Sequence, residues 1–255
     1  MPLKEQERQR AIRLKLARME AGPARPAGAP IATGFGPLDL TLGGGLPRSR
    51  ITEIFGPSSS GKTTLLLQIV AHLQHNGLNA AWFDADHSYD PAYAAQLGVA
   101  VERLPVAQAD AAEHALEIAR QLAGSGAVDL LVVDSAAALV PELELETGIG
   151  QSAPGLHSRV LASGLRKLAR TVARTDTAMV FLNQTRSRPQ PSGGEAETSA
   201  GGPPLKLYAS VRIALFVPGG MEHQVGFRVL KNKVTGGAPE GRLERWQGVG
   251  FVKSP

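Results

Sequence analysis

The sequence contains no cysteine and no long apolar run, and each absence excludes a class of protein. Without cysteine the chain can form neither disulfide bonds nor thiolate metal sites, which suits the cytoplasm. The longest apolar runs, such as residues 130–133, are as long as a strand and far shorter than the roughly 18–20 residues that span a membrane. The N-terminus is charged and lacks the apolar core of a secretion signal. We therefore expect a cytoplasmic protein with no membrane partner.

Length and charge set the remaining bounds. A chain of 255 residues is long enough for one large α/β core with a small appendage. The formal net charge is +4, which allows an anionic partner such as nucleic acid but does not identify one.

The most informative segment runs from Gly56 to Thr64 and follows the phosphate-loop pattern G-x-x-x-x-G-K-[ST]. Residues 51–55 before it are predicted to form a buried strand and residues 62–75 after it a helix, which is the context that the pattern requires. Glycines let backbone N–H groups approach phosphate oxygens, and the helix N-terminus adds a favourable dipole. Pattern and context together favour a nucleoside-triphosphate site over an ordinary Gly/Ser turn. The expected ligand-binding residues are Gly56, Ser58, Ser59, Ser60, Gly61, Lys62, Thr63 and Thr64, with Lys62 on the β- and γ-phosphates and Thr63 on Mg²⁺.

Strands and helices are predicted to alternate from Gly34 onward, which favours an α/β fold with a twisted, mostly parallel sheet and helices on both faces. After residue 205 consecutive strands are expected, so the sheet should end in antiparallel strands, the first two joined by a hairpin at 218–220. The predicted strands are 51–55, 80–85, 103–108, 129–134, 178–184, 205–217, 224–234 and 242–252. The predicted helices are 62–75, 90–97, 111–123 and 155–173.

Two domains are expected, residues 1–30 and residues 31–255. The first consists of a basic amphipathic helix over 1–20 and a Pro/Gly linker over 21–30 that breaks it. Docking of this helix on its own core and docking on a neighbouring molecule are equally compatible with its spacing. Within the core, segments 143–155 and 186–204 are rich in Gly and Pro without apolar periodicity, so we expect two long functional or disordered loops.

Polar side chains follow the ends of the predicted parallel strands. Asp134 ends the run 130–133 and is expected to bind Mg²⁺ beside Thr63, the alternative being a cap on the next turn. Asp86, two residues after Asp84, is a candidate to orient water against the γ-phosphate, although either acid can also start the following turn. Gln184 ends the predicted strand 178–184, where its amide can sense the γ-phosphate or satisfy loop backbone.

Basic residues flank the two long segments. Arg159 and Arg166 on the predicted helix 155–173, and Arg186 at the start of the second segment, suit contact with the phosphates of a single nucleic-acid strand. A solvated basic face accounts for the same residues equally well. His72 and His75 lie three positions apart without a further ligand, so we interpret them as surface residues and not as a metal site.

These motifs resemble the ATPase core of the RecA recombinase family over residues 33–234. The resemblance is carried by segments 42–47, 56–64, 90–94, 132–135, 181–184, 206–212 and 231–233. It implies ATP and Mg²⁺ as ligands, single-stranded DNA as a partner, and assembly into a homo-oligomer or filament. Segments 143–155 and 186–204 would then be the two DNA-binding loops, and the helix over 1–20 would dock on the adjacent protomer.

The resemblance also implies roles for single residues at matching positions. It places Asp90 and Tyr93 at the adenine, Gln184 between the γ-phosphate and the second loop, Lys206, Lys231 and Lys233 at an ATP held by the neighbouring protomer, and Arg159, Arg166, Gly201 and Gly202 near DNA phosphates. The implied catalytic residues are Lys62, Asp86 and Gln184.

The sequence departs from the family pattern at four points. The catalytic position is Asp86 where the family has Glu, and one methylene fewer withdraws the carboxylate by about 1.5 Å, which predicts slow hydrolysis and a long-lived ATP state. The second loop lacks an aromatic residue, and Leu207 replaces an interface aromatic. The chain stops near Pro255, where the bacterial recombinase continues into a C-terminal domain. These departures predict a reduced paralogue.

Two functions remain open from the sequence. The first is a DNA-dependent ATPase that forms filaments on single-stranded DNA in homologous recombination, DNA repair or the SOS response. The alternative is an accessory RecA-like protein of the DNA-damage response or translesion synthesis, which meets other repair proteins and uses ATP binding as an assembly switch without strand exchange. A related signalling ATPase is disfavoured because segment 231–233 and the two loops follow the recombinase pattern. The intact phosphate loop favours the first function.

Overall fold

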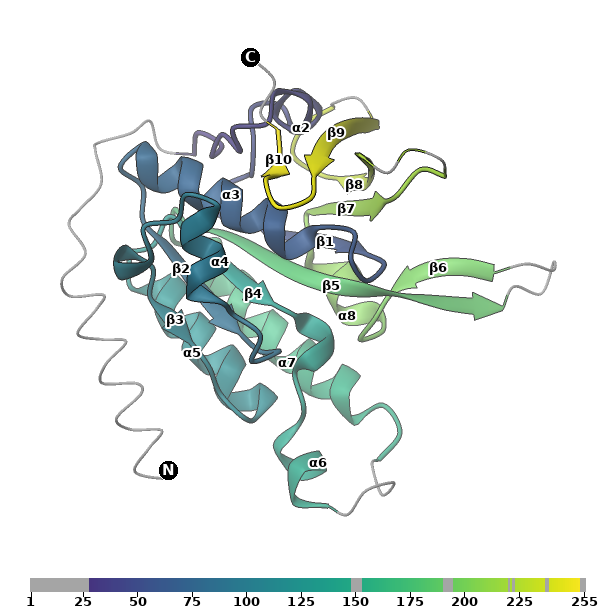
Figure 1. Cartoon of the computed structure of the whole chain (residues 1–255). Coiled ribbons are helices and arrows are strands. Elements are labelled where there is room, and N and C mark those ends of the chain that lie inside the picture. Colours follow the sequence, from purple (N-terminus) through teal and green to yellow (C-terminus); the bar gives the residue numbers. More distant parts are fainter. Residues whose placement is uncertain are drawn as a thin grey trace.

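A computed structural model describes residues 28–147, 153–189, 195–219, 221, 223–236 and 239–252 (Figure 1). The expected helix over 1–20 and most of its linker lie outside the described residues. Within the part of the chain that is described, no helix has the length and apolar character needed to cross a bilayer.

One large mixed sheet organises the chain. Its strand order is β10-β9-β8-β7-β1-β5-β4-β2-β3, with β6 attached to β5. Neighbours from β3 to β7 pair in parallel, and β7 to β10 continue as antiparallel strands, so both halves of the predicted sheet are confirmed. The strands are β1 (Ile51–Gly56), β2 (Ala80–Asp84), β3 (Val106–Ala107), β4 (Leu130–Asp134), β5 (Ala178–Pro189), β6 (Glu195–Ser199), β7 (Val211–Phe216), β8 (Gln224–Asn232), β9 (Glu240–Trp246) and β10 (Gly250–Phe251).

Helices cover both faces of this sheet, as predicted (Figure 1). The α-helices are α2 (Gly36–Leu42), α3 (Lys62–His75), α4 (Pro91–Gln96), α5 (Ala112–Gly124), α6 (Glu142–Glu146), α7 (Leu156–Val172) and α8 (Pro203–Tyr208). Short 3-10 turns occupy Val101–Arg103 and Ala136–Ala138.

The central strands are apolar throughout because each face of the sheet has its own core. In β4, Leu130 and Val132 pack with α3, whereas Leu131 and Val133 pack with α5 and α7. Side chains alternate between the two faces of a strand, so a strand that is covered on both sides reads as one continuous apolar run. Burying each such side chain stabilises the fold by about 1.5–3 kcal/mol. The packed strands in turn hold the polar residues at their ends in fixed positions.

Five segments differ from the sequence-based predictions. Residues 242–252 form the end of β9 and the short strand β10, which pair antiparallel across a turn at 247–249, instead of one strand. Residues 203–208 form helix α8 instead of the start of a strand, because Pro203 and Pro204 suit the first turn of a helix and cannot donate to a sheet. Residues 142–146 form helix α6 within an expected loop. In segment 186–204, residues 186–189 and 195–199 are not loop but paired antiparallel strands of β5 and β6, with Arg186 opposite Thr198. In segment 103–108 only Val106–Ala107 is a strand.

Candidate nucleotide-binding site

The turn between β1 and α3 is built around glycines that no other residue could replace easily. A Cβ on Gly56 would come 2.7 Å from the carbonyl oxygen of Leu215. Gly61 has φ +85°, a left-handed conformation that side chains disfavour. Ser58 and Ser59 are exposed, whereas the Ser60 side chain is buried near Gly56 and has no hydrogen-bond partner among the described residues. The loop therefore offers backbone and exposed hydroxyls at the N-terminus of α3, which suits phosphate.

Lys62 folds back onto this loop. Its Nζ donates to the carbonyl oxygens of Gly56, at 3.0 Å, and Pro57, at 2.8 Å. Partial burial lowers the pKa of Lys62, and the nearby carboxylates of Asp134 and Asp86 oppose that effect. The side chain is thus a cation held at the mouth of the loop by neutral carbonyl groups.

Thr63 and Asp134 meet beside the loop. The Thr63 hydroxyl donates to Asp134 Oδ2 at 2.8 Å. Burial raises the pKa of Asp134 to about 6, with Asp86 and Asp84 adding to the rise and the Thr63 bond and Lys62 opposing it. Hydroxyl and carboxylate oxygens are suitable ligands for Mg²⁺, which usually takes one or two carboxylates together with substrate phosphates. The described residues include no cluster of three or more His, Asp or Glu side chains that could hold a metal by itself.

The two acids after β2 have different environments. Asp84 is buried and accepts hydrogen bonds from the backbone N–H groups of Ser88, at 3.0 Å, and Tyr89, at 3.1 Å. It therefore holds the following turn. Asp86 lies beyond the strand and is exposed, and its Oδ1 accepts from the Ser135 backbone N–H at 3.1 Å and from the Ser135 hydroxyl at 2.9 Å. Only Asp86 borders the pocket described below.

The two amide side chains in the middle of β5, Asn183 and Gln184, also have different environments. Asn183 is buried, and its Nδ2 donates to Glu53 Oε1 and to the Ala200 carbonyl, both at 3.0 Å. Gln184 is exposed and lies level with Gly56 in the sheet register. Its carbonyl accepts the Ala200 N–H at 2.9 Å, which joins the strand to the return of the hairpin.

One pocket of about 340 Å³ is lined by Lys62, Thr63, Asp134, Asp86 and Gln184, but not by the buried Asp84 and Asn183. A second pocket of about 380 Å³ adjoins it and shares Ser59, Thr64 and Arg245. The first is lined by Ser58, Ser59, Gly61, Lys62, Thr63, Thr64, Asp86, Asp134, Ser135, Gln184 and Arg245. The second is lined by Ser59, Thr64, Tyr93, His223, Arg245, Trp246, Gln247, Gly248 and Gly250.

The second pocket has aromatic walls. Tyr93 touches the α3 side, where its hydroxyl lies 2.9 Å from the Thr64 hydroxyl. His223 and Trp246 stack with ring centroids 4.1 Å apart. Asp90 does not line either pocket, because its carboxylate caps α4 by accepting the N–H groups of Ala92 and Tyr93. A polar pocket beside an aromatic one suits a nucleotide, with phosphates in the first and the base in the second.

A model of the RecA N-terminal domain matches residues 19–244. The chain belongs to the RecA family. Protein RecA of Rhodospirillum rubrum is 49% identical over 212 residues, which cover 80% of this chain and 58% of that protein. Protein RecA of Gluconobacter oxydans is 49% identical over 212 residues, with 80% and 61% covered. Protein RecA of Thermus thermophilus is 48% identical over 230 residues, with 87% and 68% covered. The chain thus spans less than two thirds of the first two relatives.

The three lysines that the RecA resemblance assigns to a neighbour's ATP lie away from both pockets. Lys206, on α8, donates to the Thr198 hydroxyl of β6. Lys231, at the end of β8, donates to the Lys206 carbonyl at 2.7 Å, and burial, with Lys233 and Arg212 nearby, lowers its pKa. Lys233 is exposed. None of them lines the pocket of its own protomer, and their role at a neighbour stays a prediction.

The residues assigned to DNA lie on α7 and next to the β5–β6 hairpin. Arg159 and Arg166 are both exposed and seven positions apart, which puts them on one side of α7. Arg186 is exposed on β5, two residues after Gln184. Gly201 and Gly202 have φ of +80° and +77°, and they turn the chain from β6 into α8. Figure 1 shows α7, α8 and the hairpin on the same side of the molecule.

Arg245 was missed by sequence reasoning. Its Nη1 donates to the Ser59 carbonyl at 2.7 Å across 186 positions of sequence. No local motif surrounds it, so nothing in the sequence pointed to the phosphate loop. The same applies to the stacked pair His223 and Trp246.

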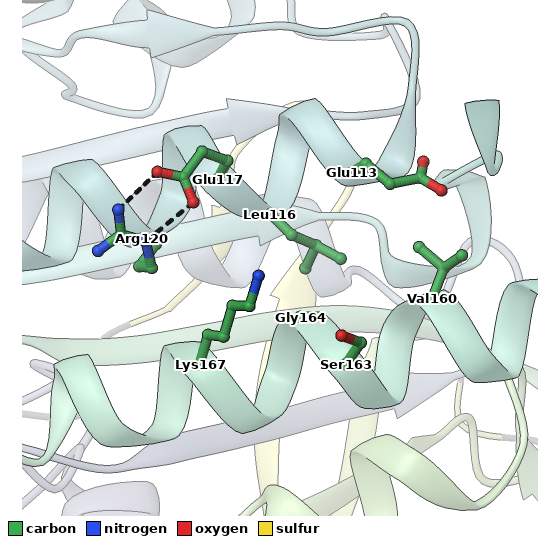
Figure 2. A pocket seen from close by; sticks show the side chains of 8 residues that line it. All are labelled: Glu113, Leu116, Glu117, Arg120, Val160, Ser163, Gly164 and Lys167. Carbon is green, nitrogen blue, oxygen red and sulfur yellow. Dashed lines mark hydrogen bonds and ion pairs between the residues drawn. The ribbon is translucent and has the colours of Figure 1, made fainter.

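A separate hollow of about 140 Å³ lies between α5 and α7 and shares no residue with the two pockets. Figure 2 shows Glu117 paired with Arg120 on α5, with Lys167 on α7 opposite them. The helices approach closely at Gly164, where a Cβ would come 2.4 Å from Leu116 Cδ1. We interpret this hollow as a consequence of helix packing.

Proposed function

We propose that this chain is an ATPase of homologous recombination and repair that binds single-stranded DNA and assembles into a filament with ATP bound. The observation that carries this proposal is the convergence of Lys62, Thr63, Asp134, Asp86 and Gln184 on one pocket, with the strand of Gln184 running directly into the β5–β6 hairpin. Membership of the RecA family supports it.

Each residue of the pocket has a proposed task. Backbone N–H groups at the start of α3 bind the phosphates, and Lys62 exchanges the carbonyls of Gly56 and Pro57 for phosphate oxygens. Thr63 and Asp134 hold Mg²⁺, which neutralises charge on the phosphates when it is bound. The Thr63–Asp134 bond keeps both oxygens together before the ion arrives.

Hydrolysis is assigned to Asp86. A water attacks the γ-phosphorus, the bond to the β–γ bridging oxygen breaks, and the proton of the water passes to the Asp86 carboxylate, directly or through a second water. The two hydrogen bonds from Ser135 hold this carboxylate back towards β4. A shorter side chain that is also tethered supports slow turnover, so that ATP binding, more than hydrolysis, sets the state of the protein.

Gln184 links nucleotide and DNA in this proposal. It borders the phosphate pocket, while its backbone carbonyl binds Ala200 at the end of the hairpin. Contact of the amide with a γ-phosphate oxygen would therefore act on the hairpin that carries Arg186. The guanidinium groups of Arg159, Arg166 and Arg186 then bind DNA phosphates.

The test is ATP-dependent binding to single-stranded DNA, followed by strand exchange with a homologous duplex. Arg159→Gln with Arg186→Gln should weaken DNA binding and flatten its salt dependence without changing ATP affinity. Arg103→Gln with Arg242→Gln is the matched control, because it removes the same two charges at exposed positions outside α7 and the β5–β6 hairpin, in the 3-10 turn before β3 and on β9. Filaments without exchange would support the accessory function, and absence of DNA binding at modest salt would refute both.

A further inference from the structure

Arg245 reaches the phosphate loop from the C-terminal part of the chain. Its backbone is fixed in β9, where it pairs with Phe251 of β10 and donates to the His223 carbonyl at 2.8 Å. The side chain leaves β9 on the same side as buried Leu243, since alternate residues of a strand share a face. It is therefore aimed across the molecule towards the loop and not out of the sheet edge.

The guanidinium lies where the loop becomes α3. Nη1 donates to the Ser59 carbonyl at 2.7 Å, and a Cβ on Gly61 would come 2.9 Å from the same nitrogen. Glycine at position 61 thus leaves the space that the guanidinium occupies. Among the described side chains that line the phosphate pocket, Lys62 and Arg245 are the two cationic ones.

The charge of Arg245 has no acidic partner in the described part of the chain, where no carboxylate forms an ion pair with it. A guanidinium carries five N–H donors in a planar fork that matches phosphate oxygens, and the contact with Ser59 uses one nitrogen. Arg245 also borders both the phosphate pocket and the aromatic pocket. Arg245 therefore lies between the expected positions of the phosphates and the base.

We infer that Arg245 binds the phosphates of the nucleotide held by its own protomer. The inference rests on the proposed nucleotide site and adds a second cation, besides Lys62, that needs no neighbouring protomer. The contact with Ser59 holds the guanidinium in place before the nucleotide arrives, and the remaining donors take the phosphate oxygens that lie nearest the base. Nucleotide affinity without DNA then depends on Arg245.

The test compares the binding of adenosine, ADP and ATP to the full chain without DNA, by calorimetry, with light scattering to confirm that no assembly occurs. A charge-assisted hydrogen bond changes affinity by about tenfold to a hundredfold. Arg245→Met should therefore weaken the binding of ADP and ATP by at least about tenfold and leave the affinity for adenosine unchanged. Arg245→Lys keeps a cation without the fork and should fall between Arg245→Met and the unaltered chain.

The matched control is Arg242→Met, on the opposite face of β9, where Arg242 contacts Gln224 Oε1 at 3.4 Å. It should bind all three ligands like the unaltered chain. Unchanged ADP and ATP affinities in both Arg245 variants would overturn the inference, as would an equal loss for adenosine. If the unaltered chain itself binds no ATP, and Lys62→Ala behaves identically, the proposed function fails instead.

Discussion

Replacing Asp134 with asparagine removes a buried negative charge while keeping the shape of the side chain and an oxygen for the Thr63 hydroxyl. Asp134 is 5% exposed, and burial is the main reason that its pKa rises to about 6. The buried Asp134 carboxylate lies where Mg²⁺ is expected to bind, and without the ion its negative charge lowers the stability of the folded protein. Asp134→Asn should therefore stabilise the fold and abolish Mg²⁺-dependent ATP binding.

The size and sign of the effect follow from the pKa. Because the pKa of Asp134 is about 6 in the folded protein and ordinarily 3.8, the unfolded chain loses this proton first as pH rises, and the free energy of unfolding falls across that window. At about 1.4 kcal/mol per pKa unit, the full difference is at most about 3 kcal/mol. Asparagine does not titrate. The free energy of unfolding of Asp134→Asn should therefore exceed that of the unaltered protein by roughly 1.5 kcal/mol at pH 5 and by about 3 kcal/mol at pH 7.5.

Urea unfolding at several pH values, with EDTA and without nucleotide, measures this difference. Asp110→Asn is the control, because it makes the same change of formal charge at an exposed position. A stability gap that is constant with pH, or that narrows as pH rises, would refute burial of the charge as its cause.

Three further changes test other parts of the molecule. Asp86→Glu should raise the kcat of ATP hydrolysis by about tenfold or more, because the longer side chain extends the reach of the carboxylate; equal phosphate-release rates would contradict this. Arg212 Nε donates to Glu53 Oε2 at 2.5 Å and Glu53 is fully buried, so Arg212→Leu should cost about 3–5 kcal/mol in urea unfolding. Adding Glu53→Leu should recover most of that loss, and a double variant no more stable than the single one would disprove the pairing. Gly45→Ala should cost more than about 2 kcal/mol in thermal unfolding, because its Cβ would come 2.0 Å from the Ile31 carbonyl at φ +129°. Gly36→Ala, with open space, should change stability by less than about 1 kcal/mol, and similar losses in both would count against steric strain.

The sequence predicts the centre of the fold well because its signals there are local. Helix 62–75 is confirmed at both ends, and the parallel strands β1, β2 and β4 are found within one residue of their predicted bounds. Carboxyl ends of neighbouring parallel strands meet at one edge, so the convergence of Asp86, Asp134 and Gln184 follows from the strand order.

Predictions from the sequence are wrong or missing where the structure depends on contacts between distant parts of the chain, or where the residue pattern fits two structures. Leu205 and Leu207 alternate like strand residues, yet α8 forms, with Leu205 buried and Leu207 71% exposed. The hairpin of β5 and β6 is polar, so it carries no apolar alternation to reveal it. Arg245 depends on a fold that brings β9 to the phosphate loop, and no local spacing encodes that approach.

The position of the three lysines, away from the pockets of their own protomer, has a consequence for assembly. If they complete the site of the next molecule, every junction is head-to-tail, and such contacts extend without closing unless a ring forms. In a row of n protomers only n − 1 sites are complete, so the shortest assemblies have the largest fraction of incomplete sites. Activity per protomer would then rise with length and level off.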